Sequence, residues 1–155
     1  QDNLDNHVMA TESDFGARNI WRIVSNVNPE ASKLVDEIAK IIAPLGIIRG
    51  GSDVKGGGPD IIPMADKGVP TIRLNQEGSD YFDLHHTPDD TLDKIIRAEL
   101  AQNVAAYAAT IFLFADTNVD LKVRRWPVEY KKPKKEAMSA FFLMSIDINF
   151  VNSLF

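Results

Sequence analysis

The sequence predicts an α/β fold in which helices flank part of a β-sheet. Two long helical patterns lie at residues 28–47 and 97–116, and a short helix and a strand rich in β-branched residues lie between them. An order of helix, strand, loop, short helix, strand, loop and helix is typical of layered α/β structures. Only about three strands can be recognised, which is few for a complete sheet.

The first helix, at residues 28–47, is the clearest element. Asn28 can cap its start, Pro29 suits its first position, and Glu30 favours the positive end of the helix dipole. Pro44 and Gly46 end it. One face repeats apolar residues at helical spacing and is expected to be buried; it carries Ala31, Leu34, Val35, Ile38, Ile41 and Ile42.

The next elements are shorter. Residues 46–51, GIIRGG, are expected to form a strand that runs into a glycine-rich loop, and residues 60–68 a short helix closed by Gly68. The β-branched segment VPTIRL at residues 69–74 follows as a strand. Many alanines favour the helix at 97–116. Its buried face is expected to contain Leu100, Val104, Ala108, Ile111, Phe112 and Ala115.

Composition limits the classes of function. The chain has 155 residues, which suits one domain, and its lack of cysteine excludes disulfides and thiolate metal sites. Residues 1–121 hold 10 Lys+Arg against 19 Asp+Glu, and this acidic body argues against a nucleic-acid surface. Residues 122–155 hold 7 against 3 and are expected to begin as a solvated basic tail. No apolar run reaches the ~18–20 residues of a membrane span. The start of the chain has no methionine and no signal-peptide pattern, and it resembles a cut inside a longer protein.

Three segments carry candidate chemistry. In ATESDFG, Glu12 and Asp14 flank Ser13, and from the residues alone this is a turn with two solvated acids. The loop GGSDVKGGGPD is flexible by composition and ends at Asp60, where a carboxylate can serve a function. In DYFDLHHTPDDTLD, His85 and His86 stand among five aspartates. Adjacent histidines point in different directions, so at most one is expected to bind a metal directly. The residues alone leave open a metal site or a polar loop.

The motifs together resemble a known family. The segments ESDFG, GGGPDIIPMADKGVPTIRLNQEGSDYFDLHHTPDDTLDKI and LAQNVAAYAATIFLFAD occur in this order. They resemble the second half of the catalytic domain of zinc exopeptidases of the carboxypeptidase Q and bacterial aminopeptidase type. The resemblance implies part of a mixed β-sheet flanked by helices, an incomplete three-layer sandwich, over residues 1–116. Residues 117–155 match nothing in the family and form a basic and then apolar tail.

The resemblance also implies roles for individual residues. The family binds two zinc ions, and the matching positions make Asp14 a ligand of one ion and His86 a ligand of the other, whereas His85 is not a ligand. Asp60, Asp90 and His85 would lie around the ligands or position the substrate. Tyr81, with Phe82, would line the pocket for a peptide or dipeptide substrate.

The same resemblance implies that the site is incomplete. Three further ligands and the glutamate general base belong upstream of the ESD motif, so the chain alone is expected to be inactive and to need its missing N-terminal half or a homo-oligomer. A secreted, periplasmic or lysosome-like location follows from the family. Two alternatives stay open: a non-catalytic remnant or interaction domain of the same fold, and a glutaminyl-cyclase-like acyl transferase.

Overall fold

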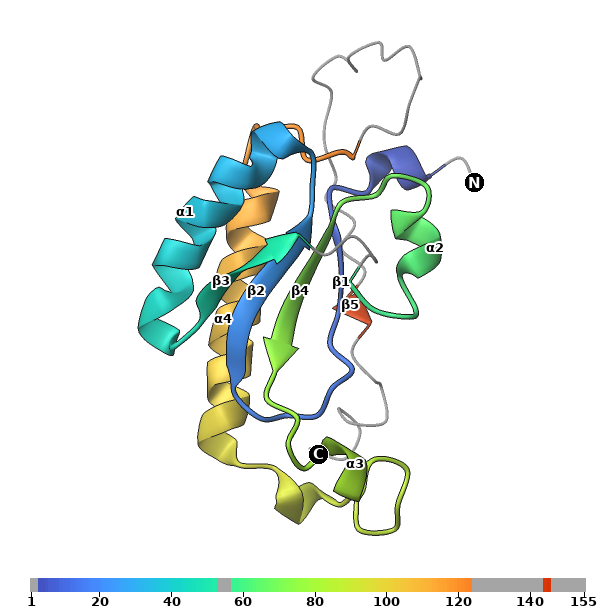
Figure 1. Ribbon diagram of the computed structural model, residues 1–155, viewed down its shortest axis with the longest axis vertical. Coiled ribbons are helices and arrows are strands. Elements are labelled where there is room, and N and C mark those ends of the chain that lie inside the picture. Colours follow the sequence, from blue (N-terminus) through green and yellow to red (C-terminus); the bar gives the residue numbers. More distant parts are fainter. Residues whose placement is uncertain (1–2, 53–56, 124–143, 146–155) are drawn as a thin grey trace.

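A computed structural model describes residues 3–52, 57–123 and 144–145 (Figure 1). Its centre is a mixed sheet with the strand order β3-β2-β4-β1, and the two-residue β5 lies next to β1. β2 and β4 are antiparallel, whereas β1 pairs with β4, and β3 with β2, in parallel. The strands are β1 (Ala10–Glu12), β2 (Ile20–Asn26), β3 (Ile48–Ser52), β4 (Thr71–Gln76) and β5 (Met144–Ser145).

Two long helices cover one face of this sheet (Figure 1). They are α1 (Ser32–Ile42) and α4 (Arg97–Ala115), and the short helices α2 (Ile62–Ala65) and α3 (Tyr81–Leu84) lie at its margins. Single 3-10 turns occur at Leu4–Asn6, Pro29–Ala31, Ala43–Leu45 and Leu92–Lys94. The main core contains Ile23 and Leu74 from the strands together with Val35 and Phe114 from the helices. The predicted α/β class with a mixed sheet flanked by helices is confirmed.

The start and end of the first helix follow the prediction. The Asn28 side chain accepts hydrogen bonds from the backbone amides of Glu30 and Ala31 at 2.7 and 3.1 Å. Gly46 ends the helical region in the left-handed conformation, with φ +82°. The predicted buried face is also right except at Ile41, which is 55% exposed because it lies at the margin of the stripe that faces the sheet.

The predicted buried face of α4 is wrong at four of its six residues. Leu100 and Ile111 are half-buried, whereas Val104, Ala108, Phe112 and Ala115 are exposed. Val104 and Phe112 are 61% and 67% exposed, and the helix instead buries a face that contains Asn103, Ala106, Tyr107, Thr110 and Phe114. Apolar residues occur around the whole helix, so their spacing alone does not select a face. The buried polar groups decide it, because the Asn103 side chain bonds the backbone oxygens of Arg18 and Glu99 at 2.9 and 2.8 Å.

Two strands are missing from the sequence prediction, β1 and β2. β2 has the sequence IWRIVSN and lies at the centre of the sheet, although polar residues interrupt its apolar pattern. Its pairing with β4 shifts register between Ile20 and Arg22, and this irregularity breaks the alternation of a regular strand. β1 has only three residues, all buried, which is too short for a periodic signal.

Length and composition would allow α4 to cross a membrane, and it is the one helix of the described residues for which this holds. A core helix of a soluble protein passes the same test, and α4 packs its Tyr107 and Phe114 side chains against the core. Beyond α4, Leu121 is 3% exposed and belongs to the same core. The predicted tail lies outside the described residues from position 124 onward, except for β5.

Candidate active-site edge

The predicted ligand segments both follow strands that end at one edge of the sheet. β1 and β4 are parallel neighbours, with Ala10 opposite Thr71 and Thr11 opposite Ile72. Asp14 comes two residues after β1, and the segment 80–91, here called the histidine loop, follows β4 through a short connection. Because parallel strands present their carboxyl ends at the same edge, the fold brings the two segments together (Figure 1).

Aromatic rings connect the two segments. Phe15, next to Asp14, stacks on Tyr81 with ring centroids 4.2 Å apart. Tyr81 stacks on His85 at 4.6 Å, and His85 stacks on His86 at 3.8 Å. The Tyr81 hydroxyl also lies 3.5 Å from the backbone oxygen of Asp14, at the outer limit of a hydrogen bond. A continuous row of four rings therefore runs from the turn after β1 to His86.

His86 has an unusual backbone. Its φ is +59°, and among the described residues it is the one non-glycine residue with a positive φ. A side chain in this left-handed region costs about 1–3 kcal/mol and persists only where neighbours hold it. Thr87 supplies such contacts, since its amide and hydroxyl donate to the Leu84 oxygen at 2.9 and 2.7 Å. Within the described part of the chain, neither His85 nor His86 forms a hydrogen bond through its ring, so the ring nitrogens of His86 are available to a ligand.

Tyr81 lies among the predicted carboxylates. Partial burial raises the pKa of its hydroxyl, and the charges of Asp14 and Asp90 raise it further. Both aspartates are exposed, and the Asp90 amide donates to the Thr87 oxygen at 3.2 Å within the histidine loop. The structure thus gathers Asp14, Tyr81, Asp90 and the two histidines at one edge of the sheet.

Glu12 differs from the expectation of a solvated acid. It is 5% exposed, and its Oε2 accepts a hydrogen bond from the Asp60 amide at 2.9 Å. Burial raises the pKa of the Glu12 carboxyl, and the charges of Asp60 and Asp14 add to this rise. Its Oε1 is buried and has no hydrogen-bond partner among the described residues. The prediction was wrong because the partner of Glu12 is a backbone amide 48 residues away, which no local pattern reveals.

Gly58 leaves room for this carboxylate. A Cβ at position 58 would lie 2.4 Å from Glu12 Oε2, so a side chain there would displace the carboxylate. Asp60 is exposed and reaches the site through its backbone amide and its charge. Glu12 and Gly58 line a small open pocket, together with Asp14, Phe15 and Arg73. The histidines are not part of its lining.

Two side chains that the sequence reasoning passed over fix the turn after β1. The Gln76 amide donates to Ser13 Oγ at 2.9 Å and to the Gly16 oxygen at 3.1 Å, which ties the end of β4 to the ESDFG segment. The Tyr107 hydroxyl donates to the backbone oxygen of Glu12 at 3.2 Å and ties α4 to the end of β1. Residue types alone carry no signal for these roles, because each contact joins segments far apart in sequence.

The donor set for a metal is partial. Asp14 and His86 are residue types that bind zinc, but the described residues contain no group of three or more His, Asp or Glu side chains close enough to hold an ion. A tightly bound zinc needs about three to four protein ligands. The described residues therefore do not complete a metal site by themselves.

Comparison with known proteins gives one match. No protein-family model matches the chain, and no curated protein matches its sequence. Among solved structures, the chain is similar to part of the Peptidase M28 precursor from Shewanella amazonensis SB2B, with 44% sequence identity over 83% of this chain and a TM-score of 0.75. The chain spans 28% of the length of that protein. This likeness agrees with the fold and supports the resemblance to peptidases.

Proposed function

We propose that this chain forms the C-terminal half of the catalytic domain of a zinc peptidase related to the Peptidase M28 precursor. The observation that carries the proposal is that the ESDFG turn and the histidine loop meet at one edge of the sheet. The chain that places them there is 44% identical in sequence to part of that precursor. The reaction would be hydrolysis of a peptide bond near a free N-terminus, in a peptide or dipeptide.

The residues of this chain would bind the zinc ions and orient the substrate. Asp14 would supply an oxygen ligand to one zinc ion and His86 a nitrogen ligand to the other, which are donor types that zinc accepts. Bound zinc in the complete protein would polarise the scissile carbonyl and activate water. Tyr81 and the 76% exposed Phe82 would contact the substrate next to the ligands. Asp60, Asp90 and His85 would position ligands or substrate.

The remaining ligands and the general base would come from outside this chain. Three observations support this, and the first two are the partial donor set and a matched structure of which the chain spans 28%. Trp21 on β2 and Ile48 on β3 are 42% and 59% exposed, as expected of strands that a further layer would cover. The missing half or a second copy of the chain would provide that layer.

Zinc content and hydrolysis test this proposal in the gene product that carries residues 1–155. We expect His86→Ala and Asp14→Asn to lower zinc content and to reduce cleavage of dipeptides and aminoacyl anilides at least 100-fold. His85→Phe is the matched control, because it keeps the stacked ring, removes the ring nitrogens and should leave zinc content unchanged. Equal zinc loss in the two histidine variants would contradict the assignment.

The alternatives give different results in the same assays. A non-catalytic remnant would bind no zinc and hydrolyse nothing. An acyl transferase of the glutaminyl-cyclase type would cyclise peptides that begin with glutamine and would leave dipeptides uncleaved. Peptidase activity of the isolated 155-residue chain in its monomeric form would refute the proposal that part of the site lies outside this chain.

A further inference from the structure

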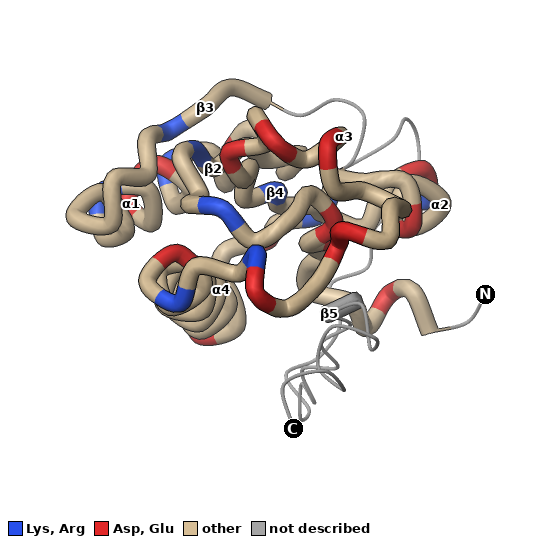
Figure 2. The backbone as a smooth tube through the Cα atoms, turned by 90° about the horizontal axis from the view of Figure 1, so that it is seen from below, with Lys and Arg blue, Asp and Glu red and all other residues tan. Residues whose placement is uncertain are grey.

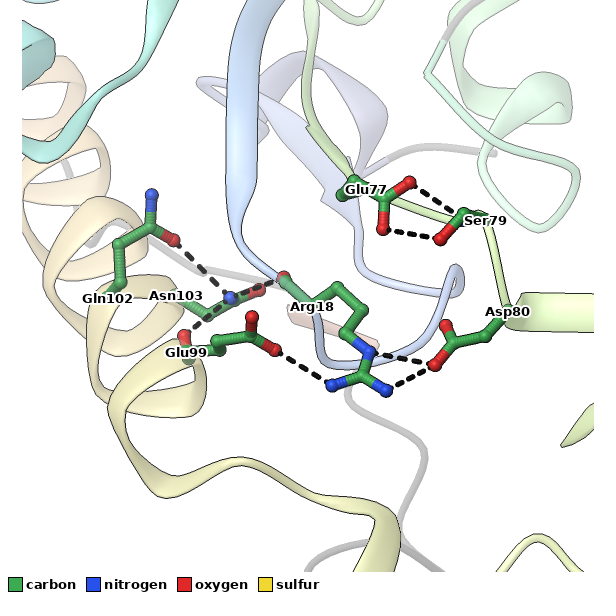
Figure 3. Close-up of polar contacts among 7 residues, drawn as sticks. All are labelled: Arg18, Glu77, Ser79, Asp80, Glu99, Gln102 and Asn103. Carbon is green, nitrogen blue, oxygen red and sulfur yellow. Dashed lines mark hydrogen bonds and ion pairs between the residues drawn. The ribbon is translucent and has the colours of Figure 1, made fainter.

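Arg18 joins three segments that meet at the candidate site (Figure 3). Its Nε donates to Asp80 Oδ2 at 2.9 Å and its Nη2 donates to the same oxygen, while its Nη1 donates to Glu99 Oε2 at 3.3 Å. Arg18 follows Asp14 by four residues, Asp80 begins the histidine loop, and Glu99 lies in the first turn of α4. One guanidinium therefore bridges the turn after β1, the histidine loop and a core helix.

Neighbouring contacts hold both ends of this bridge (Figure 3). The Asn103 side chain donates to the backbone oxygens of Arg18 and Glu99 at 2.9 and 2.8 Å, so α4 fixes the backbone as well as the side chain. On the other side, Glu77 accepts from the Ser79 amide at 2.8 Å and from its hydroxyl at 3.0 Å. These contacts restrict the chain immediately before Asp80.

The contacts of Arg18 restrict both the distance and the orientation of the segments that it joins. The side chains of Arg18, Asp80 and Glu99 are 28%, 32% and 22% exposed, so water only partly competes for them. The Asp80 and Glu99 carboxylates raise the pKa of Arg18, and the guanidinium lowers the pKa of Asp80, so the charged forms persist over the physiological range. A planar guanidinium that binds two carboxylates restricts orientation as well as distance, which a lysine ammonium cannot do.

Arg18 joins the segment that carries Asp14 to the segment that carries His86. Asp14 and His86 lie on separate segments, and the left-handed backbone of His86 requires neighbours that hold it. The stacked row from Phe15 to His86 joins the two segments through Tyr81, and Arg18 joins them through the adjacent residue Asp80. We propose that Arg18 is a positioning residue that holds the histidine loop at a fixed place relative to Asp14. This inference rests on the proposed function of Asp14 and His86 as metal ligands.

Hydrogen exchange of the backbone amides tests the bridge without any metal. In the gene product that carries residues 1–155, we expect Arg18→Met to speed exchange at residues 81–90 at least tenfold, because the loop loses its link to α4. Arg18→Lys should give an intermediate rate. The matched control is Arg49→Met, since Arg49 is 24% exposed and binds Asp36 at 3.0 Å in another part of the fold. Exchange at residues 81–90 should stay within twofold in this control.

Metal affinity and kinetics then test the consequence. We expect Arg18→Met to weaken zinc binding about 10- to 100-fold, as loss of groups that orient ligands typically does. It should lower kcat more than it raises KM, and change the visible spectrum of the cobalt-substituted protein. Arg49→Met should change none of these. Asp80→Asn should change these quantities in the same direction as Arg18→Met but leaves the Arg18–Glu99 contact in place. The double variant should be no worse than Arg18→Met, because both changes remove the Arg18–Asp80 contact.

The outcomes separate the two proposals. Unchanged exchange at residues 81–90 in Arg18→Met would overturn the positioning role even in an active zinc peptidase. Faster exchange without a change in zinc affinity or spectrum would also overturn it, because the bridge would then be merely structural. A wild-type protein that neither binds zinc nor cleaves peptides would refute the proposed function, and with it the role of Arg18 toward the ligands.

Discussion

The contact between Gly58 and Glu12 gives a prediction whose size follows from the structure. In Gly58→Ala, the new Cβ would lie 2.4 Å from Oε2, 2.5 Å from Cδ and 2.9 Å from Oε1 of Glu12. Ordinary contact begins at 3.4 Å, so the carboxylate must move by roughly 1 Å. Glu12 is 5% exposed and its Oε2 is bonded to the Asp60 amide, so the movement breaks that bond.

Two terms set the expected loss of stability. A broken hydrogen bond to a charged group contributes about 1.5–3 kcal/mol, and strain from an extra methyl in a packed site about 1–3 kcal/mol. Partial relaxation by the flexible end of Glu12 reduces the sum. We therefore expect Gly58→Ala to lower the free energy of unfolding by about 2–4 kcal/mol, measured by urea denaturation.

Gly51→Ala is the control, because a Cβ at position 51 meets nothing within 4 Å. It should change the free energy of unfolding by less than about 0.5 kcal/mol. In the double variant Gly58→Ala/Glu12→Ala, the losses of stability from the two substitutions should be less than additive, because the new Cβ no longer meets the Glu12 carboxylate. If Gly58→Ala is as mild as Gly51→Ala, the buried carboxylate is not where the structure places it.

Two further predictions concern Asp80 and α4. Arg18 lowers the pKa of Asp80, so the native carboxyl binds fewer protons than the unfolded one between its folded pKa and its ordinary value near 3.9. The pair should stabilise the fold above that value and lose its effect as the pH falls through the folded pKa, so urea denaturation of wild type and Asp80→Asn should converge in acid. On α4, the exposed Phe112 and the buried Phe114 should differ: Phe114→Ala should cost about 3–5 kcal/mol and Phe112→Ala less than about 1. A larger loss in Phe112→Ala than in Phe114→Ala would favour the helix face expected from sequence.

Local patterns were sufficient for part of the fold. The α1 helix was predictable because a cap, a stop signal and an amphipathic stripe agree within 20 residues of sequence. The α4 helix was predictable, but its orientation was not, since the buried Asn103 bonds the backbone oxygen of Arg18, 85 residues away. β2 was missed because Arg22, Ser25 and Asn26 interrupt its apolar pattern and its pairing with β4 shifts register between Ile20 and Arg22.

The candidate site divides in the same way. In the histidine loop, the adjacent His85 and His86 stand out from the residues alone, whereas the roles expected of Tyr81, His86 and Asp90 follow from the family resemblance. The environment of Glu12 depends on Asp60 and Gly58, which only the folded sheet brings near. Arg18 gave no signal either, because its partners Asp80 and Glu99 are 62 and 81 residues away.

The central claim is that the turn after β1 and the histidine loop bring two zinc ligands to one edge of the sheet. An anomalous-difference map of zinc-loaded crystals of the gene product tests it most directly. We expect zinc about 2.0–2.2 Å from an Asp14 carboxylate oxygen and a second zinc about 2.0–2.1 Å from a ring nitrogen of His86. Zinc on His85, or at any position away from Asp14 and His86, would contradict the account.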